Sequence, residues 1–314
     1  QLLLDENALV VIYGEPNAQQ VTRGPAVIEG EVRLALSGAR AVELPGGATV
    51  TGIKAAGVTA VDGAKTGRVS IFDGDVVVES QKVTVKLTQD QGTVVRADAP
   101  PLPARPLPKP PEPDAFSAVV VAGPDGLAKL PVSWSPVEHA ERYRVQLARD
   151  ARFLDLAASE MTSTRALTLE KLTPGHYQLR VIAFDAEGLQ GRASPARPVD
   201  VVLLGQGADD AGVVALRTGE APKFVAPEGY ALTPEPAKLT AGHHELEVHA
   251  ADGHVLASVR VSVRPAAPRA RGEQGTLVLE FSEDVAPGGG LTVIDGQGEV
   301  PLLQKGLRRF EATR

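Results

Sequence analysis

The sequence contains no cysteine in its 314 residues. That absence excludes cysteine nucleophiles, thiolate zinc sites and disulfide bonds. It is compatible with a periplasmic protein that folds without disulfides, although many cytosolic proteins lack cysteine as well. Aromatic residues are also scarce, at 4% with one tryptophan and four tyrosines, and no apolar run approaches the roughly 20 residues that a membrane helix needs. The sequence therefore predicts no transmembrane segment and few aromatic platforms for stacking on sugars.

The patterns that carry catalysis or bind cofactors are missing as well. No G-x-S-x-G nucleophile elbow occurs, and the run Gly288–Gly290 lacks the lysine of a phosphate-binding loop. Among the six histidines, His244 and His249 stand at an odd spacing, which places them on opposite faces of a strand. We therefore expect no catalytic residue, no cofactor and no metal site.

Charge gives a further exclusion. Asp and Glu outnumber Lys and Arg by 39 to 32, which gives a formal net charge of −7. An acidic surface repels phosphate backbones, so we expect no nucleic-acid partner. The acidic pairs Asp209-Asp210 and Glu283-Asp284 are expected in solvated loops, with a weak calcium site as the alternative.

What the sequence does contain is the signature of short β-strands. Its apolar residues are mostly Val, Leu and Ala, and they are interrupted by 32 glycines and 25 prolines. Val83, Val85 and Leu87 alternate with polar residues, as in a half-buried strand. Asp73-Gly74 and Asp252-Gly253 each separate two apolar runs and predict hairpins. The expected fold class is all-β and multidomain.

Breaks in this pattern divide the chain into four β units. The prolines of residues 100–113 favour polyproline II structure and predict a spacer that holds its neighbours about 40 Å apart. The units are expected at residues 1–99, 114–202, 203–266 and 267–314, the last being a partial C-terminal β unit.

Residues 1–99 resemble the FecR (ferric citrate regulator) domain of bacterial extracytoplasmic proteins. The resemblance lies in Leu4–Asn7, Glu29–Val32, Thr66–Val78 and Gln91–Thr93. It implies a periplasmic β-rich domain without catalytic residues. The family's upstream strand with its D-G-S turn is absent, and the chain opens at Gln1 rather than Met, so we expect a longer protein with an N-terminally truncated domain here.

Residues 114–202 resemble a fibronectin type III or related immunoglobulin-like domain. Leu172–Val181 matches the family's L-x-P-G-x-Y-x-x-R-V signature, and Trp134 ends an early strand, where such folds place a core tryptophan. The resemblance implies one structural core that contains Trp134, Leu172 and Tyr177. Residues 203–266 are generically immunoglobulin-like through Ala241–Val248.

These features predict a non-catalytic scaffold or interaction protein in the periplasm or at the cell surface of a Gram-negative bacterium. Its partners would be envelope proteins or another copy of the chain, bound at strand edges. Lys82, Lys86 and Arg33 are expected to face outward and limit indiscriminate pairing. A partner is expected to contact the N-terminal domain or the C-terminal unit, and the C-terminal unit is the better candidate because Thr276–Phe281 alone cannot close a core. Two alternatives remain open: a peptidoglycan-binding or glycan-binding envelope protein, and a FecR-type transmembrane signal-relay domain.

Overall fold

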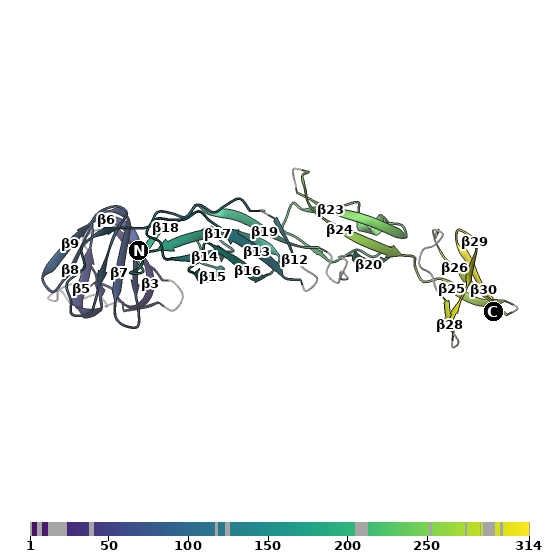
Figure 1. The fold of residues 1–314 in the computed structure, drawn as a ribbon, viewed down its shortest axis with the longest axis horizontal. Helices are drawn as coiled ribbons and strands as arrows, with labels where there is room; N and C mark the ends of the chain where they lie inside the picture. The colour runs from purple at the N-terminus through teal and green to yellow at the C-terminus, as the bar shows by residue number, and fades with distance from the viewer. Residues whose placement is uncertain are drawn as a thin grey trace. The chain divides into compact units, whose positions relative to one another are not determined.

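The chain is described by a computed structural model over residues 2–4, 8–11, 24–37, 41–116, 119–122, 126–204, 213–250, 253–273, 275–282, 284, 293–295 and 298–313. Within these ranges the regular structure consists of β-strands β1 to β30 and two short 3-10 turns, Pro45–Gly47 and Pro236–Lys238 (Figure 1). The all-β, multidomain fold class is confirmed. No helix in the described ranges has the length and apolarity needed to cross a membrane.

Backbone contacts divide the chain into two compact units. The first contains Gln1–Phe116, Pro131–Leu169 and Tyr177–Pro198. The second contains Ser117–Leu130, Glu170–His176 and Val199–Arg314. The first unit therefore combines the entire N-terminal β region with strands that follow the proline-rich segment.

The N-terminal sheet has eleven strands in the order β11-β10-β7-β6-β3-β4-β5-β8-β9, with β1 and β2 also paired to β3. Its strands are β1 (Leu2–Leu4), β2 (Leu9–Val11), β3 (Ala26–Ser37), β4 (Ala41–Leu44), β5 (Ala48–Thr51), β6 (Lys54–Val61), β7 (Gly67–Gly74), β8 (Val76–Ser80), β9 (Val83–Leu87), β10 (Gln91–Val95) and β11 (Arg105–Pro106).

Strand β3 connects the two halves of this sheet, β11-β10-β7-β6 on one side and β4-β5-β8-β9 on the other. Its first residues pair with β2 and β4, whereas Gly30–Ser37 pair with β6. Gly30, at φ 88°, marks the change, in a backbone region where glycine carries no steric penalty. Side chains from both halves, mostly valine and leucine, form one shared core that includes Val32, Leu34 and Leu87. Val83, Val85 and Leu87 share one face of β9, and burial along this face increases from the exposed Val83 to Leu87, which lies in the core.

The predicted hairpin at Asp73-Gly74 is wrong. Strand β7 pairs with β6 and β10, whereas β8 pairs with β5 and β9, so the chain passes from one half of the sheet to the other at this point. Gly74 is needed for a different reason. Its φ is 75°, and a Cβ atom there would lie 2.0 Å from the carbonyl oxygen of Lys54 on the neighbouring strand. Close backbone approach, rather than a tight turn, explains the glycine.

The hairpin between β6 and β7 depends on one carboxylate. Asp62 Oδ1 accepts the backbone N–H groups of Ala64 and Thr66, each at 3.0 Å, and Oδ2 lies 2.9 Å from the Arg68 guanidinium. Partial burial works to raise the pKa of Asp62, but the hydrogen bonds from Thr66 and Arg68, and the charge of Arg68, together hold this pKa below its usual value.

We expect Asp62→Asn to destabilise the chain at neutral pH and to have little effect in strong acid. Because the folded-state pKa is depressed, the stabilisation is present above the unfolded-state pKa and is lost as pH falls through the folded-state pKa. Thermal unfolding of wild type and variant between neutral and acidic pH measures this difference. Asp73→Asn is the control, and a pH-independent loss in Asp62→Asn would contradict the ionic role.

Strands β12 (Val119–Ala122), β13 (Ala128–Ser133), β14 (Arg142–Ala148), β15 (Leu156–Thr162), β16 (Ala166–Leu172), β17 (Gly175–Phe184), β18 (Gln190–Ala193) and β19 (Arg197–Leu204) follow the proline-rich segment. In the first unit β14 pairs antiparallel with both β15 and β17, and β18 adds to β17. These four strands are called the central sheet below. The sequence pattern did not predict β15, β18 or β19, and β19 runs past the expected boundary at residue 202.

The proline-rich segment is not a free spacer. Strand β11 pairs with β10, and Leu107 is buried against Val94. The backbone N–H groups of Leu102 and Leu107 donate to the carbonyls of Val94 and Asp90, both at 2.9 Å. Proline itself lacks this donor, but the leucines between the prolines supply it. The segment therefore lies along the N-terminal sheet, and the prediction of a 40 Å separator is wrong.

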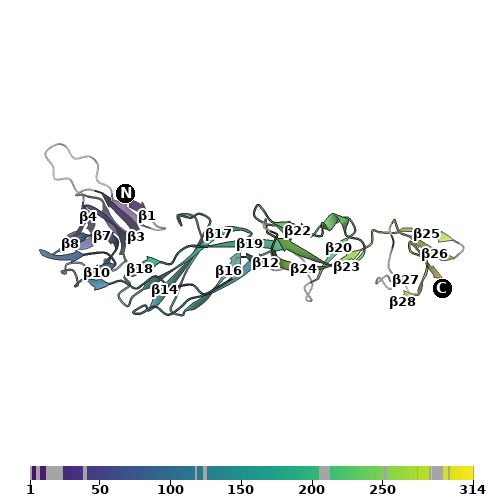
Figure 2. The ribbon, with the colours of Figure 1, turned by 90° about the horizontal axis from the view of Figure 1, so that it is seen from above.

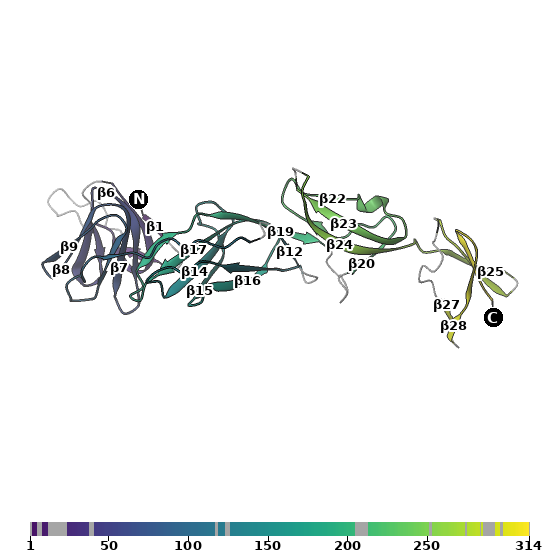
Figure 3. The same ribbon diagram turned by 45° about the horizontal axis from the view of Figure 1, so that its top comes forward.

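In the second unit β12 runs parallel to β19, and β21 (Phe224–Val225) extends β19 antiparallel. A four-stranded sheet follows, in the order β20-β24-β23-β22 (Figures 2 and 3). Its strands are β20 (Val213–Arg217), β22 (Ala231–Thr233), β23 (Gly242–His249) and β24 (Val255–Arg264). The antiparallel pairing of β23 with β24 confirms the predicted hairpin, although Asp252 lies outside the described residues.

The C-terminal strands form a small sheet in the order β25-β26-β30-β29, beside a β27-β28 hairpin. They are β25 (Arg269–Glu273), β26 (Thr276–Glu280), β27 (Val293–Asp295), β28 (Gly298–Val300), β29 (Leu302–Gly306) and β30 (Arg309–Thr313). Phe281 and Phe310 pack edge to face, with ring centroids 5.6 Å apart, and Leu279 and Leu302 lie against them. This part therefore has a small apolar cluster of its own.

Candidate interaction surfaces

A tight loop between β17 and β18 joins the central sheet to the N-terminal sheet. Asp185 shapes the loop: its carboxylate accepts the Leu189 N–H at 2.8 Å, and its carbonyl accepts the Gly188 N–H at 3.0 Å. Gly188 has φ 81°, as such a turn requires. The loop presents Leu189, which is 0% exposed and packs against Val94 and Leu107. This side chain thus links three segments that are distant in the sequence.

Polar contacts surround Leu189. The Gln190 N–H donates to the Ser70 hydroxyl at 3.1 Å, and Arg68 Nε donates to the Glu187 carbonyl at 2.6 Å. Arg144 of β14 and Glu31 of β3 form an ion pair at 2.8 Å, and both side chains are largely buried. A shielded, hydrogen-bonded pair of this kind fixes geometry more strongly than a surface pair does.

Further pairs lie at the rim of this junction. Arg192 contacts Asp90 at 2.7 Å, and Arg96 contacts Glu187 at 3.2 Å. These side chains are about a third to half exposed, so each pair contributes at most about 1 kcal/mol. Arg33 of β3 also contacts the loop between β14 and β15. Its guanidinium donates to the backbone carbonyls of Arg152 and Phe153 at 2.9 and 3.1 Å. Arg33 thus lies on the face of β3 opposite the core residues Val32 and Leu34, as expected, but it contacts another part of the first unit there.

Gly191 allows the proline-rich segment to complete the junction. A Cβ atom at this position would lie 2.2 Å from the Pro108 carbonyl oxygen. Only glycine lets two backbones approach so closely without a shift. We use the name junction for Leu189, for the residues of the N-terminal sheet and of residues 100–113 that contact its loop, and for the Glu31–Arg144 ion pair.

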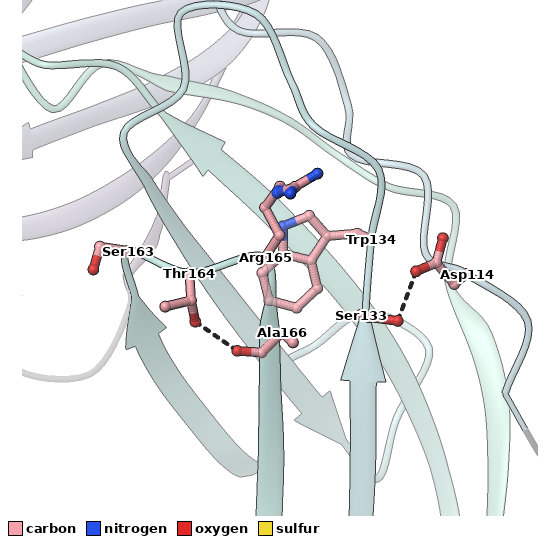
Figure 4. A pocket seen from close by; sticks show the side chains of 7 residues that line it. All are labelled: Asp114, Ser133, Trp134, Ser163, Thr164, Arg165 and Ala166. Atoms are coloured by element: carbon pink, nitrogen blue, oxygen red, sulfur yellow. Dashed lines mark hydrogen bonds between the residues drawn. The ribbon is translucent and has the colours of Figure 1, made fainter.

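An open pocket of about 540 Å³ lies between the end of β13 and the turn that joins β15 to β16. It is lined by Asp114, Ser133, Trp134, Ser163, Thr164, Arg165 and Ala166 (Figure 4). The backbone positions it through two contacts: the Trp134 N–H donates to the Arg165 carbonyl at 3.1 Å, and the Asp114 N–H donates to the Ser133 carbonyl at 2.9 Å. The turn between β15 and β16 therefore lies beside the end of β13.

Some polar groups around the pocket have hydrogen-bond partners and others do not, within the described part of the chain. The Ser133 hydroxyl donates to Asp114 at 2.6 Å, and the Thr164 hydroxyl donates to the Ala166 carbonyl at 2.7 Å. In contrast, the buried Trp134 Nε1–H has no hydrogen-bond partner among the described residues. Such an orphaned donor costs about 1–3 kcal/mol. The exposed Arg165 guanidinium likewise forms no ion pair within the described part of the chain.

The sequence assigned Trp134, Leu172 and Tyr177 to one core. Their exposed fractions are 2%, 4% and 3%. Trp134 packs against Tyr143, with ring centroids 5.2 Å apart. That all three side chains share one core stays a prediction. Sequence reasoning missed the pocket beside Trp134, and the polar run Thr162–Arg165 was the signal that could have indicated it.

Strand edges form a second kind of surface. Strand β9 ends the path of the N-terminal sheet, and β15 ends that of the central sheet. Each carries an exposed apolar side chain: Val83 is 45% exposed and Met161 46%. Lys86 is exposed as expected and pairs with Asp75 at 3.2 Å. Edges of this kind, with apolar and charged residues mixed, can accept a strand from a partner.

The histidines do not assemble a metal site in the described ranges, where no group of three or more potential ligands occurs. His249 lies 3.0 Å from Glu247 and contacts the Gly253 carbonyl, and His244 contacts the Thr240 carbonyl. Asp284 pairs with Arg308 at 2.6 Å. Asp209-Asp210, Glu283 and Gly288–Gly290 lie outside the described residues.

One acidic side chain in the second unit connects two polar partners. Asp200 of β19 contacts His176 Nδ1 at 2.5 Å, and the Tyr230 hydroxyl donates to its other oxygen. The arrangement orients an exposed imidazole, as in a histidine–carboxylate dyad. This contact connects β17, β19 and the segment at Tyr230.

No model of a known protein family matches the sequence, and no curated protein matches it. The chain is similar to solved structures of fibronectin(III)-like modules of CbhA from Clostridium thermocellum, with 18% identity over 49% of this chain and 92% of that one, at a TM-score of 0.23. The extracellular domain of BT4673 from B. thetaiotaomicron aligns at 13% identity over 64% of this chain and 35% of that one, at a TM-score of 0.21. Chicken CNTN1 FN1–FN3 domains align at 11% identity over 90% and 99%, at a TM-score of 0.23. Similarities at this level do not establish a common function.

Proposed function

We propose that the chain is a non-catalytic scaffold of a bacterial cell envelope, located in the periplasm or at the surface of a Gram-negative cell. Residues 1–99 serve as a FecR-like β domain, and residues 114–202 and 203–266 serve as fibronectin type III-like and immunoglobulin-like modules. The partners are envelope proteins or further copies of the chain. Binding takes place at β surfaces, without a reactive site.

The observation that carries this proposal is the junction. Leu189, the Glu31–Arg144 ion pair and the bond from Gln190 to Ser70 fix the N-terminal sheet to the central sheet. A free linker would let the two sheets move separately. Because they are fixed instead, the edges of β9 and β15 keep a constant relation to each other. A constant arrangement of two binding edges is what a scaffold supplies to an assembly.

The proposal is tested by placing a photocrosslinking residue at Val83 on β9 or at Met161 on β15 in the full chain. The matched control is Leu154, which is 51% exposed in a loop. In envelope fractions of the native host we expect a discrete adduct from at least one edge position and none from Leu154. No adduct, or equal adducts from all three positions, would refute the scaffold role.

A parallel sedimentation with purified peptidoglycan tests the alternative function. The scaffold account predicts that the full chain stays in the supernatant at physiological salt. Sedimentation with the peptidoglycan, combined with no adducts from the edge positions, would favour a glycan-binding protein and overturn the proposal.

A further inference from the structure

We propose that the pocket beside Trp134 binds the carboxylate end of a peptide. The site has an opening to solvent, and among the described residues its buried donor has no partner and its cation has no counterion. Its volume of about 540 Å³ lies within the usual range for small-ligand sites, roughly 300–1,000 Å³. This inference does not depend on the proposed envelope role.

The buried indole N–H indicates what kind of atom the pocket lacks. Trp134 is 2% exposed, and its Nε1 has no acceptor among the described residues. Its other contacts are satisfied, because the ring packs on Tyr143 and the backbone N–H donates to the Arg165 carbonyl. Buried polar groups in folded proteins nearly always have a partner. An oxygen acceptor from a ligand would provide one.

Arg165 indicates the charge of that acceptor. The guanidinium lines the same pocket, is exposed, and forms no ion pair within the described ranges. In Figure 4 the Arg165 side chain extends past the nitrogen edge of the Trp134 ring. A carboxylate can accept two N–H bonds from a guanidinium while one oxygen also accepts the indole N–H. The long arginine side chain has the rotamer freedom to uncover the indole edge as the ligand enters.

Asp114 distinguishes a peptide end from a simple anion. Its Oδ2 accepts the Ser133 hydroxyl at 2.6 Å, and its charge disfavours a small anion that offers no donor. A peptide end also carries an amide N–H, which the other oxygen of Asp114 can accept. A sugar is disfavoured because the Trp134 ring is buried and offers no open face for stacking.

The single tryptophan makes the test direct. With the indole labelled by ¹⁵N, the full chain gives one Nε1–H signal, and the probe is N-acetyl-dialanine with a free carboxylate. We expect a saturable downfield shift in the millimolar range or tighter. The corresponding C-terminal amide should produce no saturable shift. Arg165→Gln should weaken binding at least about tenfold, whereas Arg269→Gln, which removes an exposed guanidinium of β25, should not change it.

The remaining outcomes overturn the proposal in distinguishable ways. Equal shifts with the amide and the free acid would exclude carboxylate recognition. Equal binding of sulfate would show a general anion site. A saturable shift with an N-acetylglucosamine disaccharide that Arg165→Gln leaves unchanged would assign the pocket to glycans. No shift with any probe would show that the pocket binds none of these ligands and that the unpaired indole N–H does not mark a binding site.

Discussion

Leu189→Ala should destabilise the first unit by about 2–5 kcal/mol, the range for a fully buried leucine that leaves a cavity. The effect should extend beyond the site because Leu189 contacts both the N-terminal sheet and the proline-rich segment through Val94 and Leu107. We therefore expect one cooperative thermal transition of the first unit to separate into two. Differential scanning calorimetry measures this change.

Hydrogen exchange gives the matched readout for the same variant. In the wild type the backbone N–H groups of Leu102 and Leu107 donate to carbonyls of β10 and of the turn before it, and they should exchange slowly. Leu189→Ala should speed their exchange, whereas Leu154→Ala, at an exposed leucine of the same unit, should behave as wild type. Rapid exchange at both amides in the wild type would show that the segment is a free spacer after all.

Trp134→Ala should lower the free energy of unfolding by about 3–5 kcal/mol, because it removes the large buried indole that packs on Tyr143. Trp134→Phe should cost clearly less than Trp134→Ala, because phenylalanine keeps most of the apolar contact and the lost N–H had no partner among the described residues. Chemical denaturation of the two variants measures the order.

Two results would contradict this account of Trp134. If Trp134→Phe were as destabilising as Trp134→Ala, the indole N–H would have to make a bond that stabilises the fold. If iodide fully quenched the wild-type tryptophan fluorescence, the ring would not be buried. Val225→Ala, at an exposed residue of β21, is a suitable control for nonspecific loss of apolar surface.

The sequence predicted those parts of the fold that depend on local alternation. In β9, Leu87 is in the core and Val85 packs against it, whereas Lys86 between them is exposed, as the period of two requires. The β23–β24 hairpin was likewise predictable, because its two apolar runs flank a short turn and no other strand competes for the pairing between them.

Where long-range pairing decided the structure, local signals failed. Asp73-Gly74 has the composition of a hairpin turn, but β7 pairs with β6 and β10, and the glycine accommodates the Lys54 carbonyl. Residues 100–113 have the composition of a spacer, yet the N–H groups of Leu102 and Leu107 find acceptors on the N-terminal sheet. Neither partner is visible from a window of neighbouring residues.

The candidate site illustrates the same division. Trp134 was expected in a core from its position at the end of a strand, and its ring is buried. The pocket beside it requires Asp114 and Arg165 to meet across about 50 residues of sequence, which only the folded chain brings about. The junction had no sequence signal, because Leu189 stands in an ordinary polar loop until Val94 and Leu107 cover it.

The central claim, a fixed joint between the N-terminal sheet and the central sheet, is tested most directly by a distance distribution. The chain has no native cysteine, so Lys86→Cys and His139→Cys, both at exposed positions, introduce two unique sites for spin labels. Double electron–electron resonance on the full chain should give one narrow distance distribution, which Leu189→Ala broadens. A broad wild-type distribution, as wide as that of a flexible linker of similar length and unchanged by Leu189→Ala, would contradict the account.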